Sequence, residues 1–283
     1  MPLHLVSIHR YVVKSCRGED LAEAVVEPWG LAGDRRWMVV GPDGRFVTAR
    51  QAHALLTVRP TDTETGLTLE APGVDPIDVA RPDPAVQTPV GIWKSELTAA
   101  EAPEAAGWLS ALLGLPVRLV YLDDPTRRPT SPAFSRPGDR VSFADGYPLL
   151  LTTNASLAAL NTAIAEAGGP PVGMHRFRPN VVVDGDLPWA EDTWRRVRIG
   201  EAVFRAVKGC ARCVMTTLEP DHDTGDVAGG KDPIRTLART RRFGSEVWFG
   251  INLVPDTPGV VIRRGDPVEI LDSDTAAIAP LGA

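Results

Sequence analysis

The sequence has few cysteines, no long apolar run and no excess of positive charge, and each shortage excludes a class of protein. Three cysteines in 283 residues do not make a disulfide framework. No stretch approaches the ~18 consecutive apolar residues of a membrane span, and the N-terminus has no signal-peptide pattern. A formal net charge of −6 argues against a general nucleic-acid binder. We therefore expect a soluble protein of the reducing cytoplasm, with neither a membrane nor a nucleic acid as a partner.

The sequence also lacks the usual motifs of hydrolases and of nicotinamide-dependent dehydrogenases. Its five histidines show no metal-ligand spacing, and no His-Glu-x-x-His, Gly-x-Ser-x-Gly or Gly-x-Gly-x-x-Gly pattern occurs. The segment from Gly225 to Asp232 is close to a phosphate-binding P-loop. However, Asp232 stands where a Ser or Thr is required for the magnesium ion, and no apolar strand precedes the segment. We interpret it as a turn.

Short apolar segments alternate with turn residues through the first hundred residues, which predicts strands and almost no helix. Residues 5–13 alternate as a strand does. Residues 36–48 have the pattern of a hairpin around Gly41-Pro-Asp-Gly44. Residues 55–58 and 67–70 predict a second hairpin.

The rest of the chain predicts three helices among further short strands. The helices are expected at 101–113, at 155–167 after the capping residues Thr153 or Asn154, and at 232–242. Residues 123–140 are rich in Pro, Arg and Ser, which predicts a long loop that covers a site as a lid or flap. Strands are expected at 117–122, 147–153, 179–183, 196–199, 202–206, 248–253, 259–263 and 267–271. The predicted fold class is α+β and β-rich, a barrel-like architecture with helical insertions.

Cys210 and Cys213 form a Cys-x-x-Cys motif beside two cations, Lys208 and Arg212. This electropositive setting favours the thiolate, the form that ligates metals or attacks electrophiles. A single pair cannot form a four-cysteine zinc site within one chain. Three interpretations stay open: a redox pair, two half-buried structural thiols, or a single cysteine ligand to a soft metal such as molybdenum, copper or iron.

Two other segments have the residues that a bound phosphate and a heterocycle require. Lys14-Ser15 and Arg35 lie beside predicted strands, and two or three cations with a hydroxyl suit a phosphate. In the segment Arg176-Phe-Arg178-Pro-Asn180, the proline favours extended backbone and Asn180 offers both a donor and an acceptor. Each residue alone is also typical of a solvated surface or of a salt-bridged strand start. The hypothesis of a phosphate site therefore depends on the whole set.

Together these segments resemble the MOSC superfamily in its two-part form, a MOSC N-terminal β-barrel domain followed by a MOSC domain. The relatives that this resemblance suggests are the mitochondrial amidoxime-reducing component, its bacterial counterparts and the C-terminal domain of molybdenum-cofactor sulfurase. It covers nearly the whole chain, in order. It implies an N-terminal β-barrel-like domain over residues 1–97, packed on a MOSC β-barrel domain with helical insertions over residues 98–283. The matching segments are Tyr11–Gly18, Gly30–Trp37, Thr48–Gln51, Leu151–Leu157, Phe177–Asn180, Cys210–Cys213 with Thr216 and Thr217, Asp223–Gly225 and Gly265–Val268.

The resemblance implies a molybdenum–molybdopterin cofactor. Cys213, the second cysteine of the pair, would then be both the metal ligand and the catalytic residue. The other residues that match positions around the pterin and its phosphate are Lys14, Ser15, Arg35, Arg178 and Asn180, with Ala211 and Arg212 flanking the site and the hydroxyls of Thr153 and Ser156 beside it.

The activity that the resemblance implies is the reduction of N-hydroxylated compounds: amidoximes, hydroxylamines and N-hydroxylated bases. The chain lacks the four cysteines of an iron–sulfur domain, so a separate electron donor of the flavoprotein or ferredoxin type would be required. An alternative from another class is a carrier of molybdenum cofactor or of sulfur. A third is a protein of this fold whose cysteines are structural.

Overall fold

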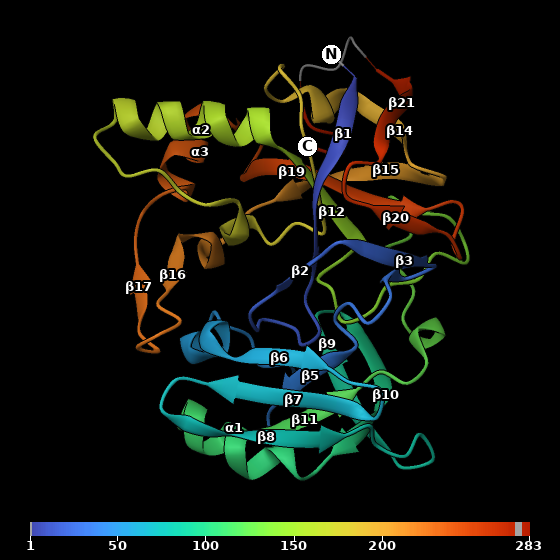
Figure 1. Cartoon of the computed structure of the whole chain (residues 1–283), viewed down its shortest axis with the longest axis vertical. Coiled ribbons are helices and arrows are strands. Elements are labelled where there is room, and N and C mark those ends of the chain that lie inside the picture. Colours follow the sequence, from blue (N-terminus) through green and yellow to red (C-terminus); the bar gives the residue numbers. More distant parts are fainter. Residues whose placement is uncertain (1, 275–278) are drawn as a thin grey trace.

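The computed structural model describes residues 2–274 and 279–283, and it confirms the β-rich fold class with few helices. Figure 1 shows strands β6, β7 and β8 at one end of the molecule and a barrel with helices α2 and α3 at the other. Among the described residues, no helix is long and apolar enough to cross a bilayer.

The elements of the described chain are mostly short strands. The α-helices are α1 (Ala105–Leu113), α2 (Asn154–Glu166) and α3 (Ile234–Thr240). The 3₁₀ helices are η1 (His53–Thr57), η2 (Pro125–Arg127), η3 (Met174–Phe177), η4 (Ala190–Thr193) and η5 (Val214–Thr217). The strands are β1 (Leu3–Arg10), β2 (Glu19–Leu21), β3 (Glu23–Glu27), β4 (Gly30–Leu31), β5 (Trp37–Val40), β6 (Arg59–Asp62), β7 (Gly66–Ala71), β8 (Val74–Ala80), β9 (Gln87–Ile92), β10 (Ser95–Ala102), β11 (Arg118–Tyr121), β12 (Leu149–Thr153), β13 (Val181–Val183), β14 (Trp194–Ile199), β15 (Ala202–Ala211), β16 (Leu218–Pro220), β17 (Val227–Gly229), β18 (Arg242–Phe243), β19 (Glu246–Pro255), β20 (Val261–Arg263) and β21 (Pro267–Ser273).

A closed barrel of seven strands forms the larger part of the fold. Its order is β12-β13-β1-β21-β14-β15-β19, and β19 pairs with β12 to close it. All neighbours are antiparallel except β12 and β13, which are parallel. Closure leaves no unpaired edge among these seven strands, as a barrel requires.

Strand β1 comes from the first ten residues but belongs to the barrel built by the C-terminal half. It pairs with β13 on one side, through Leu5 and Val183, and with β21 on the other, through Leu3 and Val268. In Figure 1 this blue strand rises from the N-terminal part into the red and yellow strands. The two parts of the chain are therefore joined by shared strand pairing as well as by a connecting segment.

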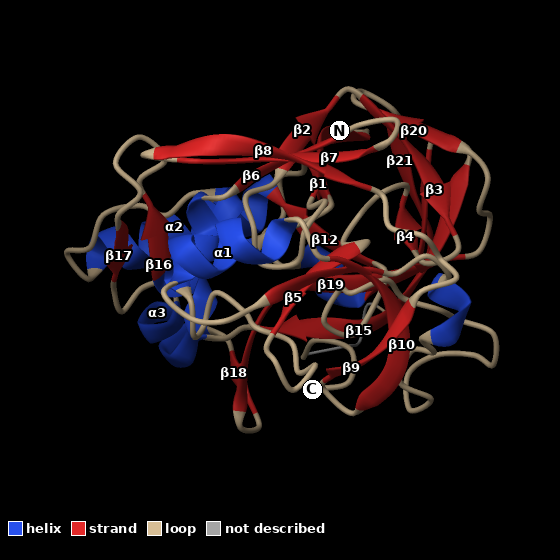
Figure 2. Cartoon of the chain, turned by 90° about the horizontal axis from the view of Figure 1, so that it is seen from below, coloured by secondary structure: helices blue, strands red, loops and turns tan. Residues whose placement is uncertain are grey.

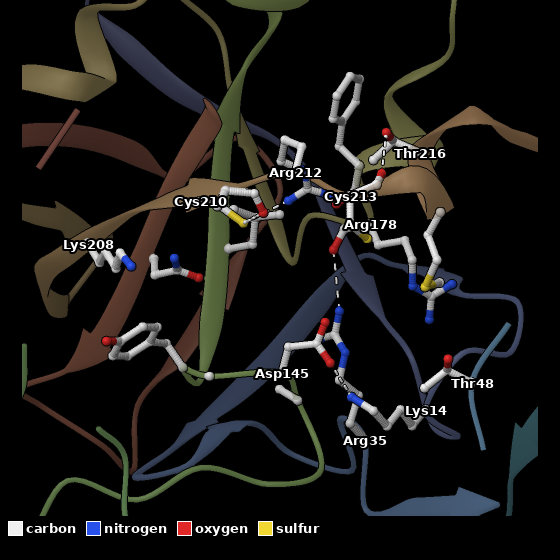
Figure 3. A pocket seen from close by; sticks show the side chains of 18 of the residues that line it. Lys14, Arg35, Thr48, Asp145, Arg178, Lys208, Cys210, Arg212, Cys213 and Thr216 are labelled. Carbon is white, nitrogen blue, oxygen red and sulfur yellow. Dashed lines mark hydrogen bonds and ion pairs between the residues drawn. The ribbon is translucent and has the colours of Figure 1, made fainter. Parts of the chain in front are cut away.

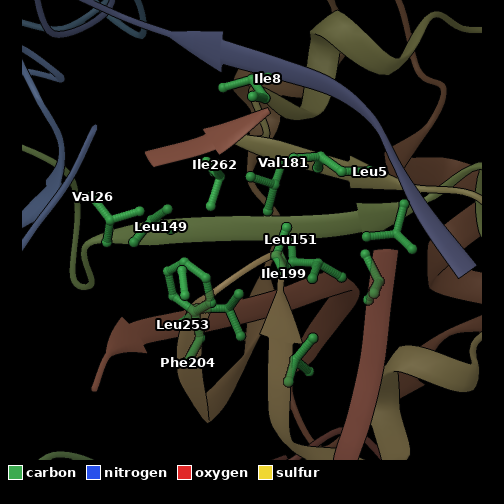
Figure 4. Packing of buried hydrophobic residues seen from close by; sticks show 14 of the residues in the cluster. Leu5, Ile8, Val26, Leu149, Leu151, Val181, Ile199, Phe204, Leu253 and Ile262 are labelled. Carbon is green, nitrogen blue, oxygen red and sulfur yellow. The ribbon is translucent and has the colours of Figure 1, made fainter. Parts of the chain in front are cut away.

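The barrel interior is filled by aliphatic and aromatic side chains from alternate strand positions. Leu5, Leu151, Val181, Phe204 and Leu253 are each at most 1% exposed and pack together (Figure 4). Full burial of such a side chain contributes roughly 1.5–3 kcal/mol. This core fixes the ends of β12, β13 and β15, from which candidate site residues project.

The N-terminal part, residues 11–121, contains two smaller antiparallel sheets of its own, the strands β3 and β4 that form a sheet with β20, and one α-helix. One sheet has the order β5-β11-β10-β9 and the other β6-β7-β8, and α1 packs on β11 and β8. Seen from below, the α-helices lie toward one side of the molecule and the strands curve around the rest (Figure 2). Strand β10 runs across the domain boundary expected at residues 97 and 98, and the placement of that boundary stays a prediction.

Most predicted elements are present, with corrections where burial does not follow the sequence pattern. Residues 55–57 lie in η1 instead of a strand; Leu55 and Leu56 are both buried, whereas a strand with one buried face alternates. The second hairpin is present, but its first strand is β6, which begins at Arg59; its second strand, β7, contains the predicted residues 67–70. Residues 45–48 form no strand; they meet β5 through a bridge from Phe46 to Val40 and a hydrogen bond from the Val47 N–H to the Val39 carbonyl over 2.8 Å.

Two further differences concern the start of a helix and a strand that the sequence pattern did not show. The helix expected at 101–113 begins at Ala105, because residues 95–102 extend the sheet as β10. Strand β8 was not predicted: it contains Pro76 and most of its residues are exposed, so it gives no alternating apolar signal. The helix α2 and its cap at Thr153 are confirmed.

Candidate active site

A cavity of about 670 Å³ lies where the N-terminal part faces the barrel. Its N-terminal wall comes from residues between 14 and 94, and its barrel wall from residues between 144 and 252. Figure 3 shows Cys210, Arg212 and Cys213 on one side, with Lys14, Arg35 and Asp145 on the opposite side. Seven of the predicted cofactor-binding residues line this cavity together with Cys213: Lys14, Ser15, Arg35, Arg178, Asn180, Ala211 and Arg212.

The cavity is strongly basic although the chain as a whole is acidic. Among the described residues that line it are two carboxylates, Asp145 and Glu246, and eight cations. Such a concentration of one sign in a concave site attracts an anionic ligand. The cations are Lys14, Arg35, Arg50, Lys94, Arg176, Arg178, Lys208 and Arg212.

Lys14 is a buried cation that forms an ion pair with Asp145. Its side chain is 6% exposed, and its ammonium also donates to the carbonyl of Phe143 over 2.9 Å. Burial lowers the pKa of Lys14 from 10.5 to about 8, against the opposite effect of Asp145. Desolvation would raise the pKa of Asp145, but Lys14 and then Arg50 and Arg35 outweigh it and hold that pKa below its ordinary value. Because the Asp145 side chain is 59% exposed, its desolvation is incomplete, and the surrounding cations decide the direction of its pKa shift.

Arg35 and Arg178 form a second cationic group around Tyr11. Their guanidinium carbons lie 4.5 and 4.1 Å from the centroid of the Tyr11 ring. Arg35 Nη1 donates to Asp34 Oδ2 over 2.6 Å, and Arg178 Nη1 donates to the carbonyl of Cys16 over 2.7 Å. Burial raises the pKa of Tyr11 to about 12, so the ring stays neutral between the two cations.

The backbone is held in a sparsely populated conformation at several lining residues. Five described non-glycine residues have a positive φ, and four of them line the cavity: Ser15 (71°), Arg35 (49°), Trp93 (52°) and Arg178 (54°). Each such residue costs of order 1–3 kcal/mol and persists where the surrounding structure imposes it, often at functional sites. This clustering supports the choice of the cavity as the candidate site.

The two cysteines of the motif reach the cavity, and the third does not. Cys210 lies on β15 and accepts a hydrogen bond from Arg212 Nη1 over 2.7 Å. Cys213 follows the strand and accepts one from Arg50 Nη2 over 3.2 Å. Cys16 is fully buried, and burial raises its pKa to about 12. The thiols that line the cavity are therefore Cys210 and Cys213, and each lies beside a guanidinium.

Two predicted cofactor residues, Thr153 and Ser156, do not line this cavity. Thr153 caps α2 through a hydrogen bond from the Ser156 backbone N–H to its Oγ1 over 3.2 Å. Both hydroxyls lie on the buried carboxylate of Glu191, at 3.1 and 2.9 Å from Oε2. Burial raises the pKa of Glu191 to about 7. Their hydroxyls are engaged in this buried cluster at the start of α2, which explains why they do not reach the basic cavity.

Sequence reasoning missed three residues that shape the cavity: Arg50, Trp93 and Asp145. Arg50 lies in the segment 48–51, which was matched to the family without being assigned to the site. Trp93 gave no signal, because a tryptophan at a hairpin turn has no characteristic pattern. The loop 123–140 does not line the cavity as a lid; its buried Arg128 donates to the carbonyls of Ser142 and Ala144 and so braces the segment that carries Asp145.

Two buried nitrogens at the cavity have no partner among the described residues: Arg178 Nη2 and Arg212 Nε. Unsatisfied buried donors of this kind require an acceptor from water or from a ligand. The amide of Asn180, by contrast, is used by the protein: Oδ1 accepts from the Leu150 N–H and from Arg35, and Nδ2 donates to the carbonyl of His9. Asn180 therefore shapes the wall.

The residues present fit an anionic cofactor that brings most of its own metal ligands. The described residues contain no group of three or more His, Cys, Asp or Glu side chains that could hold a metal ion. A metal at this cavity would take Cys213 as its protein ligand and its other donors from the cofactor. Thiolate suits a soft metal, and the orphaned arginine nitrogens suit phosphate or pterin oxygens.

Two family models match the chain, and several known proteins are similar to most of it. Residues 3–116 match the MOSC N-terminal beta barrel domain, and residues 138–269 match the MOSC domain. Mitochondrial amidoxime-reducing component 1 of Homo sapiens is 34% identical over 92% of this chain and 81% of its own length. Mitochondrial amidoxime reducing component 2 of Homo sapiens is 34% identical over 91% of this chain and 80% of its own length. Molybdenum cofactor sulfurase of Oryza sativa subsp. japonica is 31% identical over 89% of this chain, which spans 32% of that longer protein.

Proposed function

Because the chain belongs to the MOSC family, with a MOSC N-terminal domain and a MOSC domain, we propose that it binds a molybdenum–molybdopterin cofactor in the basic cavity and reduces N-hydroxylated compounds there. The substrates would be small amidoximes, hydroxylamines or N-hydroxylated bases. The observation that carries the proposal is a thiol, Cys213, on the wall of a cavity lined by eight cations and two carboxylates in a chain of net charge −6.

In this proposal the predicted site residues divide into those that bind the cofactor, one that supports an arginine, and one that ligates the metal. Lys14, Ser15, Arg35 and Arg178 bind the phosphate and the pterin, since they combine buried positive charge, a hydroxyl and one orphaned donor. Asn180 holds Arg35 in place. Ala211 and Arg212 flank the cofactor beside Cys213, which ligates the metal. Thr153 and Ser156 have no part, because they lie on Glu191.

When bound, the cofactor supplies the two-electron redox centre at which N–OH becomes N–H and water, with two protons taken up. The chain's own residues orient that centre and compensate charge. Arg50 and Arg212 donate to the two cavity sulfurs, and the Lys14–Asp145 pair places a cation opposite them. Trp93 and Tyr147 also line the cavity.

The electrons would come from a separate donor of the flavoprotein or ferredoxin type. The names of the human relatives, which act on amidoximes, support the substrate class. The cytoplasm remains the compartment that we propose, and neither a membrane nor a nucleic acid is needed as a partner.

A second candidate function is a carrier of molybdenum cofactor or of sulfur on Cys213. The similarity to molybdenum cofactor sulfurase favours it, because binding the pterin does not require turnover. The two functions differ in one observable: a carrier has no reductase activity with an artificial electron donor.

The test is reduction of benzamidoxime by reduced methyl viologen, with protein from a host that makes the cofactor. We expect turnover by the wild type and none by Cys213→Ser. The matched control is Cys16→Ala, which removes a cysteine that is fully buried outside the cavity and should leave turnover intact. Cofactor-loaded wild type without turnover would favour the carrier, and undiminished turnover in Cys213→Ser would refute the role of this sulfur.

A further inference from the structure

One arginine of the N-terminal part reaches across the cavity to the sulfur of Cys213. Arg50 Nη2 donates to Cys213 Sγ over 3.2 Å. Arg50 precedes η1 in the N-terminal part, whereas Cys213 is the second residue after β15 of the barrel. The N-terminal part of the chain therefore supplies a contact to the very atom that would bind the metal.

The guanidinium of Arg50 is held from two other directions. Its central carbon lies 5.0 Å from the centroid of the Trp93 ring, and its Nη2 lies 3.8 Å from Asp145 Oδ2. The side chain is 26% exposed, so these contacts are partly shielded from water. The guanidinium consequently has little freedom to leave the sulfur.

Trp93 is itself fixed in an unfavourable conformation. It occupies the two-residue turn between β9 and β10, where Ile92 pairs with Ser95, and its φ is 52°. Such turns favour Gly, Asn or Asp. Its indole Nε1 donates to Asp145 Oδ1 over 3.3 Å, and its ring lies 4.8 Å from that of Phe46. A bulky residue kept at a strained turn indicates a task for its side chain.

The backbone at Arg50 is also restrained. The Arg50 N–H donates to Thr48 Oγ1 over 3.3 Å, and the Gln51 side-chain oxygen accepts from both the N–H and the hydroxyl of Thr48. These hydrogen bonds lie within the four residues 48–51 and fix the backbone position from which the Arg50 side chain extends.

We propose that Arg50 is a positioning residue for Cys213: its hydrogen bond orients the sulfur and withdraws electron density from it, while Trp93 and Asp145 hold the guanidinium in place. The inference rests on the proposed function, since it takes Cys213 as the metal ligand. Hydrogen bonds to a ligating sulfur raise the reduction potential of the metal, and residues behind a ligand often change affinity or activity by about 10–100-fold.

The first experiment needs no cofactor. In cofactor-free protein carrying Cys210→Ser, Cys213 is the remaining thiol of the cavity, and its alkylation by iodoacetamide is followed by mass spectrometry at one pH. Arg50→Gln removes the guanidinium that lies against Cys213 Sγ and should slow alkylation by about fivefold. The control is Arg59→Gln, a 63% exposed arginine outside this cavity, which should leave the rate unchanged. An equal rate in Arg50→Gln and wild type would overturn the contact.

The second experiment uses cofactor-loaded protein and measures the Mo(V) electron paramagnetic resonance spectrum and the reduction potential. Arg50→Gln should shift the potential to more negative values and alter the spectrum, with turnover lower by about 10–100-fold. Trp93→Ala should change both in the same direction by less, and Trp93→Phe should restore them because a ring face is again present.

The outcomes separate this inference from the proposed function. An unaltered potential and spectrum in loaded Arg50→Gln, with an active wild type, would overturn the role of Arg50 and leave the function standing. Loss of cofactor content alone, with an unaltered spectrum in the loaded fraction, would also overturn it. Wild type without molybdenum would remove the proposed function, and the alkylation rates would still decide whether Arg50 acts on the Cys213 sulfur.

Discussion

Replacing Asp145 by Asn tests whether this carboxylate holds the buried cations of the cavity together. Asp145 pairs with Lys14, and its other oxygen lies 3.8 Å from Arg50 Nη2. The substitution keeps the size of the side chain and removes its charge. Lys14, which is 4% exposed, then has the carbonyl of Phe143 as its described acceptor.

The expected loss in free energy of unfolding on Asp145→Asn lies between the values for breaking a buried ion pair and an exposed one. Breaking a buried pair costs about 3–5 kcal/mol of the free energy of unfolding, whereas an exposed pair contributes about 0.2–1 kcal/mol. The Lys14 side chain is 6% exposed and that of Asp145 is 59% exposed, so solvent screens one end. We therefore expect Asp145→Asn to lower the free energy of unfolding by about 1–3 kcal/mol at pH 7.

The pH dependence makes the prediction specific to Lys14. Burial lowers the pKa of Lys14 from 10.5 to about 8, so between these pH values the folded state binds fewer protons than the unfolded state. The contribution of Lys14 to stability therefore rises with pH across this window. Because Asp145 supports the charged form of Lys14, the cost of Asp145→Asn should be full below pH 8 and decline as Lys14 becomes neutral above it.

The assay is urea unfolding of wild type and variant at pH 7 and at pH 9.5. The dependence of the free energy of unfolding on urea concentration should be the same for both proteins, so that a shifted midpoint reports a change in stability. The control is Glu96→Gln, which breaks the exposed pair with Arg45 and should cost less than about 1 kcal/mol at both pH values. An equal cost of Asp145→Asn at pH 7 and pH 9.5, or no cost at either, would refute the reasoning.

Three further predictions follow from the same geometry. Loss of the positive charge of Lys14 above pH 8 should weaken cofactor retention, so pterin kept after gel filtration should fall between pH 7 and pH 9.5; constant retention would contradict this. Burial raises the pKa of Glu191 from 4.5 to about 7, so between these pH values the folded state binds more protons than the unfolded state, and stability falls as the pH rises. In urea unfolding, Glu191→Gln should therefore raise the free energy of unfolding above that of the wild type by about 2–3 kcal/mol at pH 8 and by little at pH 5. Thr153→Ala should cost about 1 kcal/mol of unfolding free energy through the lost helix cap but leave pterin content unchanged, whereas lost pterin would return Thr153 to the cofactor site.

The sequence predicted the site best where a residue's role depends on its own chemistry. A thiol pair next to cations drew attention to Cys210 and Cys213, and cations with a hydroxyl drew attention to Lys14, Ser15 and Arg35. The structure brings these together in one cavity. Their assignment to a cofactor comes from the resemblance and stays a proposal, since composition and spacing cannot specify a pterin.

The sequence could not predict features that depend on distant partners. The resemblance suggested Thr153 and Ser156 as ligand hydroxyls. The residue that engages them in the structure, Glu191, lies 35 or more positions away along the chain and gave no local signal. Arg50 and Asp145 are common surface types, and only the folded chain places them at Cys213 and Lys14.

In the fold, too, local features could be predicted from the sequence and long-range pairings could not. Strand β1 alternates and was predicted, but its place between β13 and β21 results from pairing with residues some 170 or more positions later. Local pattern predicts that a strand exists, while its neighbours are set by the burial of its apolar face in the whole barrel.

The most direct test of the central claim is the molybdenum and pterin content of protein purified from a cofactor-competent host, wild type beside Cys213→Ser. Molybdenum is measured by plasma mass spectrometry and released pterin by fluorescence. We expect near-stoichiometric molybdenum and pterin in the wild type, with the metal lost or perturbed in the variant while the arginine- and lysine-bound pterin is retained. Wild type that carries neither molybdenum nor pterin would contradict a cofactor site at this cavity.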